Sequence, residues 1–389
     1  MQIEKEDGLT MKFILIPDSF KGTLSSTQIC GLMKKKIDVH FPGSTAVSIP
    51  VADGGEGSVD AFLEAIGGSK EFETVKNPYF EDMQAYYGLI DGGQTAVIEM
   101  AACAGLPLVE DRKDPRKTTT YGVGQLILAA AKKGVKKIVV GLGGSSTNDA
   151  GCGAAAACGV KFYNEKGESF VPTGGTTGDV KKIDLSGIDP ALSGIEFVAM
   201  CDIDNPMYGP TGAAYIFGPQ KGADEEMCET LDQGIKSLSR AIADAIGRDI
   251  SEVPGTGAAG AMGAGMIAFF GARLQMGIQT VLDVVKFDEL AKDADYILTG
   301  EGKLDSQSLR GKVVIGIAER AKKQNKNVIA IVGGADDAQI GAAYDMGVTA
   351  VFPINRLPQD FSISRNHSEE NLSYTVDNVL RLIKSAQKA

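Results

Sequence analysis

Short apolar runs, each followed by a glycine-rich acidic loop and then by an amphipathic stretch, dominate the first part of the chain. Residues 13–16 form one such run, the loop 17–22 follows, and Ile29, Leu32, Met33 and Ile37 then share one helical face. The pattern repeats, because the apolar run 46–51 leads into the loop 52–57 and then into apolar residues at 59, 62, 63 and 66. This order predicts strand, loop and helix twice in succession.

The last third of the chain returns to this rhythm. Apolar runs at 296–298, 328–332 and 348–352 alternate with predicted helices, the first of them at 312–323. Alternating strands and helices imply right-handed crossovers, which predict a parallel sheet covered on both faces. We expect a Rossmann- or flavodoxin-like α/β domain that is built from both ends of the chain.

Between residues 72 and 283 the pattern changes. Segments 83–89 and 95–100 are typical of antiparallel strands, and the sequence at 164–167 indicates a hairpin turn. We therefore predict two α/β domains. One is discontinuous, 11–71 plus 284–389, and the other is a mixed α/β domain, 72–283, inserted into it, while 1–10 form an N-terminal extension. A chain of 389 residues is long enough for two cores.

Composition argues against several classes of protein. Apolar residues make up 43% of the chain and charged residues 23%, which is typical of globular proteins, and a net charge of −11 disfavours nucleic acid as a partner. The six cysteines form no C-x-x-C pair, and the polar first ten residues lack the apolar core of a signal peptide. The longest apolar stretch, 257–272, is too short for a membrane span and predicts a core helix. We expect a cytoplasmic protein with no nucleic-acid or membrane partner, and a homodimer is one alternative for its oligomeric state.

Only two histidines occur, and neither lies in a catalytic setting. His40 precedes a Phe-Pro-Gly turn, and His367 lies in the polar run 364–370. Acid–base chemistry is therefore expected from carboxylates or lysines.

Three loops that mix acidic residues, glycines and lysines follow predicted strands. Ligands of open parallel sheets bind outside the carboxyl ends of the strands, so these loops are expected to share one site. Any one of them alone is also explained as a tight turn. The candidate side chains, which suit Mg²⁺, proton abstraction or anion binding, are Asp18, Ser19 and Lys21, then Asp53 and Glu56, and finally Glu301, Lys303 and Asp305.

A glycine and hydroxyl loop follows the apolar run 138–142 in the middle segment. It contains Gly143, Gly144, Ser145, Ser146, Thr147 and Asn148 and precedes a run of small residues. Such a loop is typical of a phosphate cradle, and it is equally typical of a capped turn on a tightly packed helix. Asp202 and Asp204 follow another strand and are candidates for holding Mg²⁺, although Asp204 also fits an Asx-turn before Pro206.

Several well-known catalytic motifs are absent from the sequence. It contains no G-x-x-x-x-G-K-[ST], H-R-D or D-F-G, so the P-loop and protein-kinase classes are excluded, and it contains neither H-E-x-x-H nor G-x-S-x-G. The run 255–260 matches G-x-G-x-x-G, but no convincing strand precedes it, so it does not predict a dinucleotide site.

Six motifs occur in order: PDSFKG, VADGGEGS, GLGGSSTNDAG, CDIDNP, FGPQKGA and LTGEGKLDSQSLRGK. In order and spelling the chain resembles the bacterial glycerate kinase family, over nearly everything from Met11 onward. The resemblance implies two α/β domains flanking a site and ATP-dependent, Mg²⁺-assisted phosphorylation of D-glycerate. In many members of the family the 2-hydroxyl is the acceptor, which gives 2-phosphoglycerate and ADP.

The resemblance and the residue types together suggest roles. Lys21, Arg310 and Lys303 are expected to neutralise the substrate carboxylate and the transferring phosphoryl group. Asp53, Glu301 and Asp305 are expected to share Mg²⁺ coordination and alignment of the attacking hydroxyl, and which of them is the base stays open. Substrate contacts are expected from Asp18, Ser19, Glu56 and Lys303, nucleotide phosphate contacts from residues 143–148 with Lys221, and metal contacts from Asp202, Asp204 and Asp305.

Three alternatives remain at this point. A non-catalytic two-lobed protein that binds a small organic acid would gain no affinity from several carboxylates near its anionic ligand, because the carboxylates repel the ligand. An NAD-dependent hydroxy-acid dehydrogenase would need a dinucleotide fingerprint and a catalytic histidine. A glycerate kinase that forms 3-phosphoglycerate uses the same types of residue.

Overall fold

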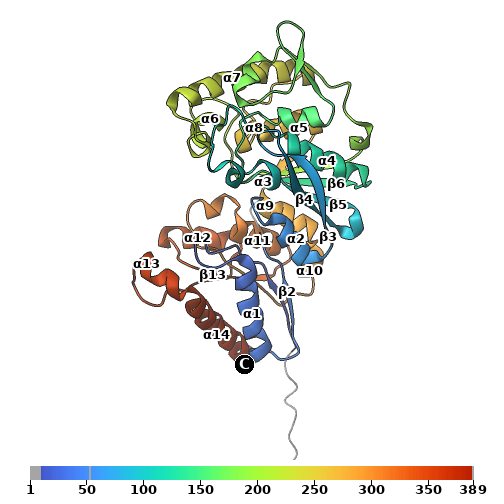
Figure 1. The fold of residues 1–389 in the computed structure, drawn as a ribbon. Coiled ribbons are helices and arrows are strands. Elements are labelled where there is room, and N and C mark those ends of the chain that lie inside the picture. The colour runs from blue at the N-terminus through green and yellow to red at the C-terminus, as the bar shows by residue number, and fades with distance from the viewer. Residues whose placement is uncertain (1–9, 52–53, 388–389) are drawn as a thin grey trace, which may run out of the picture. The chain divides into compact units, whose positions relative to one another are not determined.

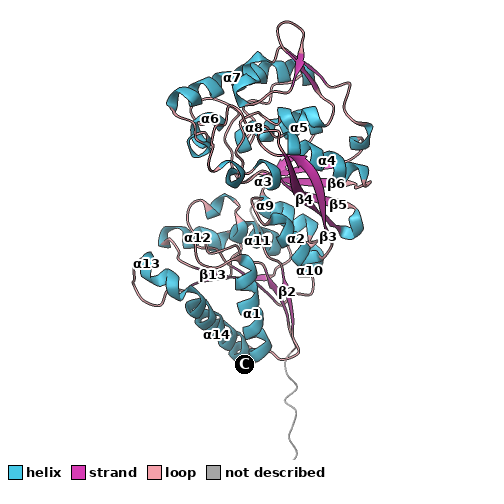
Figure 2. Ribbon diagram, in the orientation of Figure 1, coloured by secondary structure: helices cyan, strands magenta, loops and turns pink. Residues whose placement is uncertain are grey.

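The chain divides into two compact units. The structure is a computed structural model that describes residues 10–51 and 54–387. The terminal unit comprises Met1–Ala52 and Ile278–Ala389, and the inserted unit comprises Asp53–Gly277. Each unit has its own central sheet and its own apolar core, so each is described by itself (Figures 1 and 2).

The terminal unit is built on a five-stranded sheet in which every neighbouring pair of strands is parallel. Central strands such as β13 are buried almost throughout, as expected for a parallel sheet covered on both faces. The predicted parallel sheet from both ends of the chain is confirmed. Its strands, in spatial order, are β14 (Ala350–Pro353), β13 (Asn327–Val332), β12 (Tyr296–Thr299), β1 (Lys12–Leu15) and β2 (Thr45–Ser48).

Helices α1 and α14 pack side by side over one face of this sheet (Figure 1). Helix α1 begins with a capping box, in which Ser25 and Gln28 bond each other's backbone N–H groups. The helices of the terminal unit are α1 (Ser26–His40), α9 (Gly277–Val284), α10 (Phe287–Ala291), α11 (Val313–Lys322), α12 (Asp337–Asp345), α13 (Phe361–Ser364) and α14 (Ser368–Ala386).

The inserted unit contains a six-stranded mixed sheet, which confirms the predicted change of pattern in the middle of the chain. Strands β3, β4 and β5 pair antiparallel, whereas β5, β6, β10 and β11 are parallel. In spatial order the strands are β11 (Arg273–Gln275), β10 (Glu196–Met200), β6 (Lys137–Gly141), β5 (Thr95–Glu99), β4 (Asp82–Ile90) and β3 (Ser69–Lys76).

A small antiparallel sheet and several helices complete the inserted unit. The predicted hairpin at 164–167 joins β7 (Lys161–Tyr163) to β8 (Ser169–Phe170), and β9 (Lys182–Asp184) pairs with β7. The predicted core helix near 257–272 is α8. The helices are α2 (Ser58–Ile66), α3 (Ala101–Ala104), α4 (Tyr121–Lys132), α5 (Cys152–Ala157), α6 (Ala213–Phe217), α7 (Glu225–Ile246) and α8 (Ala258–Phe270).

The unit boundaries differ from those expected from the sequence, 71/72 and 283/284. Helix α2 belongs to the inserted unit because it packs on β4 and β5. Gly88 on β4 makes room for Val59, since a Cβ at Gly88 would lie 3.1 Å from a Val59 methyl group. The buried Glu99 of β5 accepts a hydrogen bond of 2.6 Å from the Val59 N–H and so holds the start of α2. Strand β2 and helix α2 follow each other in the sequence, yet β2 belongs to the terminal unit and α2 to the inserted unit.

Among the described residues, no helix has both the length and the apolar character needed to span a membrane.

Candidate active site

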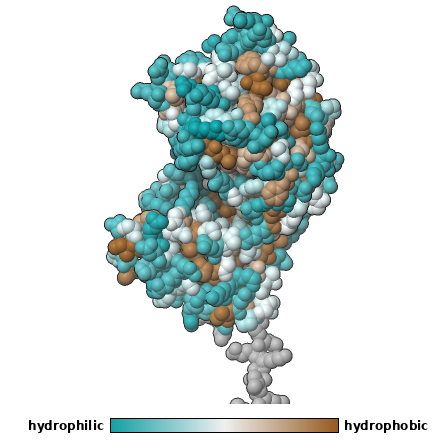
Figure 3. Space-filling view, in the orientation of Figure 1, coloured by the Kyte–Doolittle hydropathy of each residue, from teal (hydrophilic) through white to brown (hydrophobic). Residues whose placement is uncertain are grey.

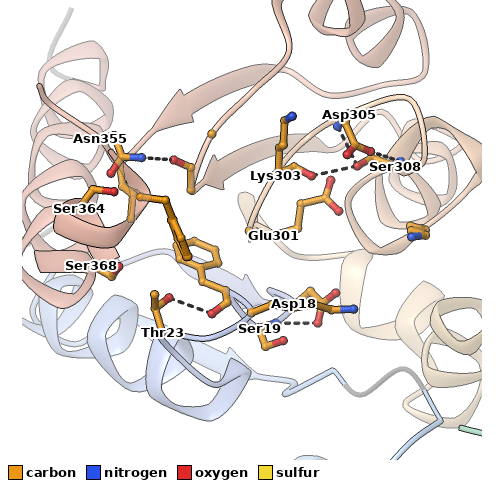
Figure 4. A pocket seen from close by; sticks show the side chains of 18 of the residues that line it. Asp18, Ser19, Thr23, Glu301, Lys303, Asp305, Ser308, Asn355, Ser364 and Ser368 are labelled. Atoms are coloured by element: carbon orange, nitrogen blue, oxygen red, sulfur yellow. Dashed lines mark hydrogen bonds between the residues drawn. The ribbon is translucent and has the colours of Figure 1, made fainter. Parts of the chain in front are cut away.

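Loops at the carboxyl edge of the terminal sheet enclose a cavity of about 560 Å³ (Figure 4). They follow β1, β12, β13 and β14, so parallel strands bring together residues that are more than 300 positions apart in the sequence. Six of the predicted site residues line this cavity: Asp18, Ser19, Lys21, Glu301, Lys303 and Asp305.

Glu301 is the most unusual carboxylate of the cavity. Only 7% of its surface is exposed, and its Oε1 has no hydrogen-bond partner among the described residues. Burial raises the pKa of Glu301 to about 7, the nearby Asp18 and Asp305 carboxylates add to the rise, and a hydrogen bond with Ser308 opposes it. A carboxyl group with this pKa can exchange a proton near neutral pH.

The loop that carries Glu301 is held by its own hydrogen bonds. Asp305 Oδ1 accepts from the Gln307 N–H at 2.9 Å, and Ser308 Oγ accepts from the Asp305 N–H at 3.1 Å and donates to the Lys303 carbonyl at 3.2 Å (Figure 4). On the loop after β1, Asp18 Oδ1 accepts from the Ser19 N–H at 2.6 Å. These bonds orient the carboxylates at the cavity wall.

Lysines supply the positive charge of the cavity. Lys21 and Lys303, two of the candidates from the sequence, are exposed and line it. Lys312 also lines it and donates to Gln307 Oε1 at 3.0 Å, and the sequence analysis did not single it out. Its position two residues past the Ser308–Arg310 turn was the available signal. Arg310 is exposed and is not among the residues that line the cavity.

The other loop predicted for this edge is placed differently. Asp53 lies outside the described residues, and Glu56 is an exposed residue of the inserted unit. Glu56 lines neither this cavity nor the one described next.

A second cavity, of about 270 Å³, lies in the inserted unit beside the glycine and hydroxyl loop. Gly143, Gly144, Ser145 and Lys221 line it, as does Asp202. Lys221 is 1% exposed, and its ammonium group donates to Ser145 Oγ at 2.9 Å and to the Thr147 carbonyl at 2.6 Å. Burial lowers the pKa of Lys221 to about 7, and the nearby Asp149 opposes this effect. Lys221 therefore supports the loop from inside.

The rest of the loop faces the protein interior. Ser146 Oγ donates to the Ala104 carbonyl at 3.0 Å, whereas Thr147 Oγ1 and both polar atoms of the Asn148 side chain are buried without a partner among the described residues. None of these three residues lines the second cavity. The fully buried Asp149 accepts hydrogen bonds from Thr120 and from the start of α5, and burial raises its pKa.

The three predicted metal ligands lie in different surroundings. Asp202 is exposed and accepts from the Gly277 N–H at 2.7 Å, Asp204 is exposed and does not line the second cavity, and Asp305 belongs to the terminal unit. Within residues 10–51 and 54–387 no group of three His, Cys, Asp or Glu side chains is arranged to hold a metal ion.

A magnesium ion does not require such a group. Mg²⁺ commonly keeps several waters and binds through one or two carboxylates and the substrate phosphates. The Asp305 carboxylate, in one cavity with lysines, fits an ion bound in this way.

Comparisons with known proteins agree on one family. The family model described as "Glycerate kinase family" matches residues 13–384. A glycerate kinase from Bacillus cereus is 42% identical over 97% of this chain and 99% of its own length, and a glycerate 2-kinase from Escherichia coli K12 is 42% identical over 88% and 90%. A crystal structure of a candidate glycerate kinase 2 from Salmonella typhimurium LT2 superposes with a TM-score of 0.85 at 38% identity, covering 98% of this chain and all of that one.

Proposed function

The chain belongs to the glycerate kinase family, and from that premise we propose that it transfers the terminal phosphoryl group of ATP to the 2-hydroxyl of D-glycerate. The products would be 2-phosphoglycerate and ADP. The choice of the 2-hydroxyl is supported by the Escherichia coli relative, which is named a glycerate 2-kinase. The phosphoryl transfer itself is supported by a cavity that combines a buried carboxylate with lysines.

The single observation that carries the mechanism is the buried, partly unpartnered Glu301. In the transfer, the substrate hydroxyl oxygen forms a bond to the γ-phosphorus, the bond between that phosphorus and the β,γ-bridging oxygen breaks, and ADP leaves. Glu301 accepts the hydroxyl proton. A base whose pKa is close to the working pH is both ionised and basic enough for this step.

The lysines of the cavity provide binding and charge stabilisation. Lys21, Lys303 and Lys312 would neutralise the carboxylate of glycerate and the transferring phosphoryl group, because phosphoryl transfer depends mainly on positioning and on stabilising negative charge. Asp18 would accept hydrogen bonds from the glycerate hydroxyl groups, and the Ser19 hydroxyl would donate to them or accept from them. Glu56 and Arg310 do not line the cavity, and Asp53 lies outside the described residues, so the roles expected for these three from the sequence remain predictions.

Magnesium would be held by the Asp305 carboxylate in the cavity of the terminal unit. When bound, Mg²⁺ neutralises phosphate charge and orients the phosphate chain. In the inserted unit, the nucleotide-phosphate contacts expected from Gly143, Gly144 and Ser145 remain a prediction from the sequence, and Lys221 keeps the Ser145 hydroxyl in place through its hydrogen bond.

Product identification tests this proposal. The purified protein is incubated with ATP, Mg²⁺ and D-glycerate, ADP release is followed, and the product is examined by phosphorus NMR without proton decoupling. In 2-phosphoglycerate the phosphate ester oxygen is on a CH group and gives a doublet, whereas the CH₂ ester of 3-phosphoglycerate gives a triplet. A triplet would overturn the 2-hydroxyl assignment, and absence of glycerate-dependent ADP release would overturn the kinase activity in favour of a binding protein.

A further inference from the structure

The cavity of the terminal unit is larger than glycerate requires. Its volume of about 560 Å³ lies within the range of roughly 300 to 1,000 Å³ that is typical for ligands of drug size. Glycerate has only seven non-hydrogen atoms. The cavity therefore has room for a second and larger ligand.

The two ends of the cavity differ in chemistry (Figure 4). Glu301, Lys303 and Asp305 lie at a charged end, while Asn355, Ser364 and Ser368 lie together at the other end, which their side chains make polar and uncharged. Both groups of residues line the same cavity. A single elongated ligand can reach both ends.

Asn355 presents a hydrogen-bond acceptor at the neutral end. Its Nδ2 donates to the Gly333 carbonyl at 2.8 Å, which fixes the amide and leaves Oδ1 as an acceptor for a ligand. Ser364 and Ser368 are 5% and 7% exposed, so their hydroxyl groups belong to the wall rather than to the open surface. Ser368 donates to the Arg365 carbonyl at 3.0 Å and keeps its oxygen lone pairs for a donor.

An aromatic residue on α13, the helix that carries Ser364, also lines the cavity. Phe361 lines the cavity, yet 58% of its surface is exposed, so its ring is not packed within the apolar core. Apolar side chains gather on the surface where α13 lies (Figure 3). The Arg365 guanidinium carbon lies over this ring, 5.8 Å from its centroid, and a flat ligand can cover the other face.

We infer that the neutral end binds the adenine base of the nucleotide, with Phe361 against the face of the base and Asn355 Oδ1 accepting a hydrogen bond from its 6-amino group. The triphosphate then extends toward the lysines at the charged end. A base with a carbonyl group at position 6 would place two acceptors against each other, so Asn355 makes the site selective for adenine. This inference rests on the proposed kinase function and assigns the base-binding part of that site.

Binding of ADP and IDP, measured by titration calorimetry, tests the inference without requiring turnover. The two ligands differ at position 6, where ADP has an amino group and IDP a carbonyl group, and at the neighbouring N1, which is an acceptor in ADP and carries a proton in IDP. The unaltered protein is expected to bind ADP about tenfold more tightly than IDP, and Asn355→Ala is expected to bind the two equally. Phe361→Ala is expected to lower the affinity for ADP and for IDP about tenfold each, which is within the range for loss of an aromatic ring beneath a base.

Ile363→Ala is the matched control. Ile363 is on the same helix, is 52% exposed and does not line the cavity, so its truncation should leave the affinity for ADP unchanged. Unchanged ADP affinity in Phe361→Ala and unchanged discrimination in Asn355→Ala would overturn the inference, as would equal losses in Phe361→Ala and Ile363→Ala. A protein that binds ADP as expected but phosphorylates no glycerate would instead refute the proposed function alone.

Discussion

Replacing Glu301 by Gln should make the protein more stable and much less active. The side chain is buried, carries a partnerless oxygen and has a pKa near 7, so its ionised form is held in an unfavourable environment. Gln keeps nearly the same shape and cannot ionise. It therefore removes the cost of the buried charge together with the proposed base.

The size of the effect follows from the pKa. A rise from 4.5 to about 7 corresponds to about 3 kcal/mol, since each pKa unit is worth about 1.36 kcal/mol. Between these pH values the folded protein retains a proton that the unfolded chain has released, so the free energy of unfolding falls as the pH rises. The cost is absent below pH 4.5 and complete above about pH 7. Glu301→Gln should be the more stable protein above pH 7, by up to about 3 kcal/mol, and should lose this advantage in acid.

Urea unfolding followed by circular dichroism, at about pH 5 and about pH 8.5, measures this difference, with the exposed Glu319→Gln on α11 as a control. In parallel, kcat/KM of the unaltered protein should rise with pH to a plateau above about 7. At that plateau, kcat/KM of Glu301→Gln should be lower by roughly 10²- to 10⁴-fold. The reasoning would be refuted if the stability of Glu301→Gln and that of the unaltered protein followed the same pH dependence.

Other outcomes follow from the same geometry. Lys21→Ala should lower kcat/KM at least about tenfold with unchanged stability, because the exposed side chain binds charge and fills no core, whereas Lys34→Ala on α1 should have no kinetic effect; equal kinetics in the two variants would remove Lys21 from the site. Excess EDTA should abolish ADP release and added Mg²⁺ should restore it, and full turnover in EDTA would contradict the proposed use of Mg²⁺. Glu99→Ala should cost about 1 to 3 kcal/mol in thermal unfolding, because it leaves the Val59 N–H without its buried acceptor; an unchanged midpoint would show that this bond does not hold α2.

The site in the terminal unit could be predicted from the sequence because a parallel sheet imposes the arrangement. Each apolar run ends where a polar loop begins, and all these ends lie along one edge, so Asp18, Lys21, Glu301 and Asp305 had to be neighbours once the strands were recognised. The pattern alone therefore located most of the charged end of the cavity.

The neutral end could not be predicted in the same way. Asn355 and Phe361 follow β14 in a polar, exposed segment that resembles an ordinary surface loop, and only the position of β14 beside β13 brings them to the cavity. The burial of side chains in the glycine and hydroxyl loop could not be predicted from the sequence either. Ser146 and Asn148 face the interior there, although their residue types suggest ligand contact. Side-chain direction there is set by tertiary contacts with Ala104 and Lys221, which no local spacing reveals.

The loop that carries Glu301 was explained from the sequence either as a tight turn or as part of a ligand site. Its glycines show that both explanations can hold together. A Cβ at Gly300 would lie 2.0 Å from the Ile331 carbonyl oxygen, and one at Gly333 would lie 2.4 Å from the Gly302 carbonyl oxygen, so backbone meets backbone at both places. The Asp18 N–H donates to the Gly300 carbonyl at 2.8 Å, and the Gly333 N–H donates to the Glu301 carbonyl at 3.0 Å. The loops after β1, β12 and β13 are thus joined directly through their backbones. Because Glu301 lies at the centre of this contact, the same close packing that requires glycine also removes water from its carboxyl group and raises its pKa.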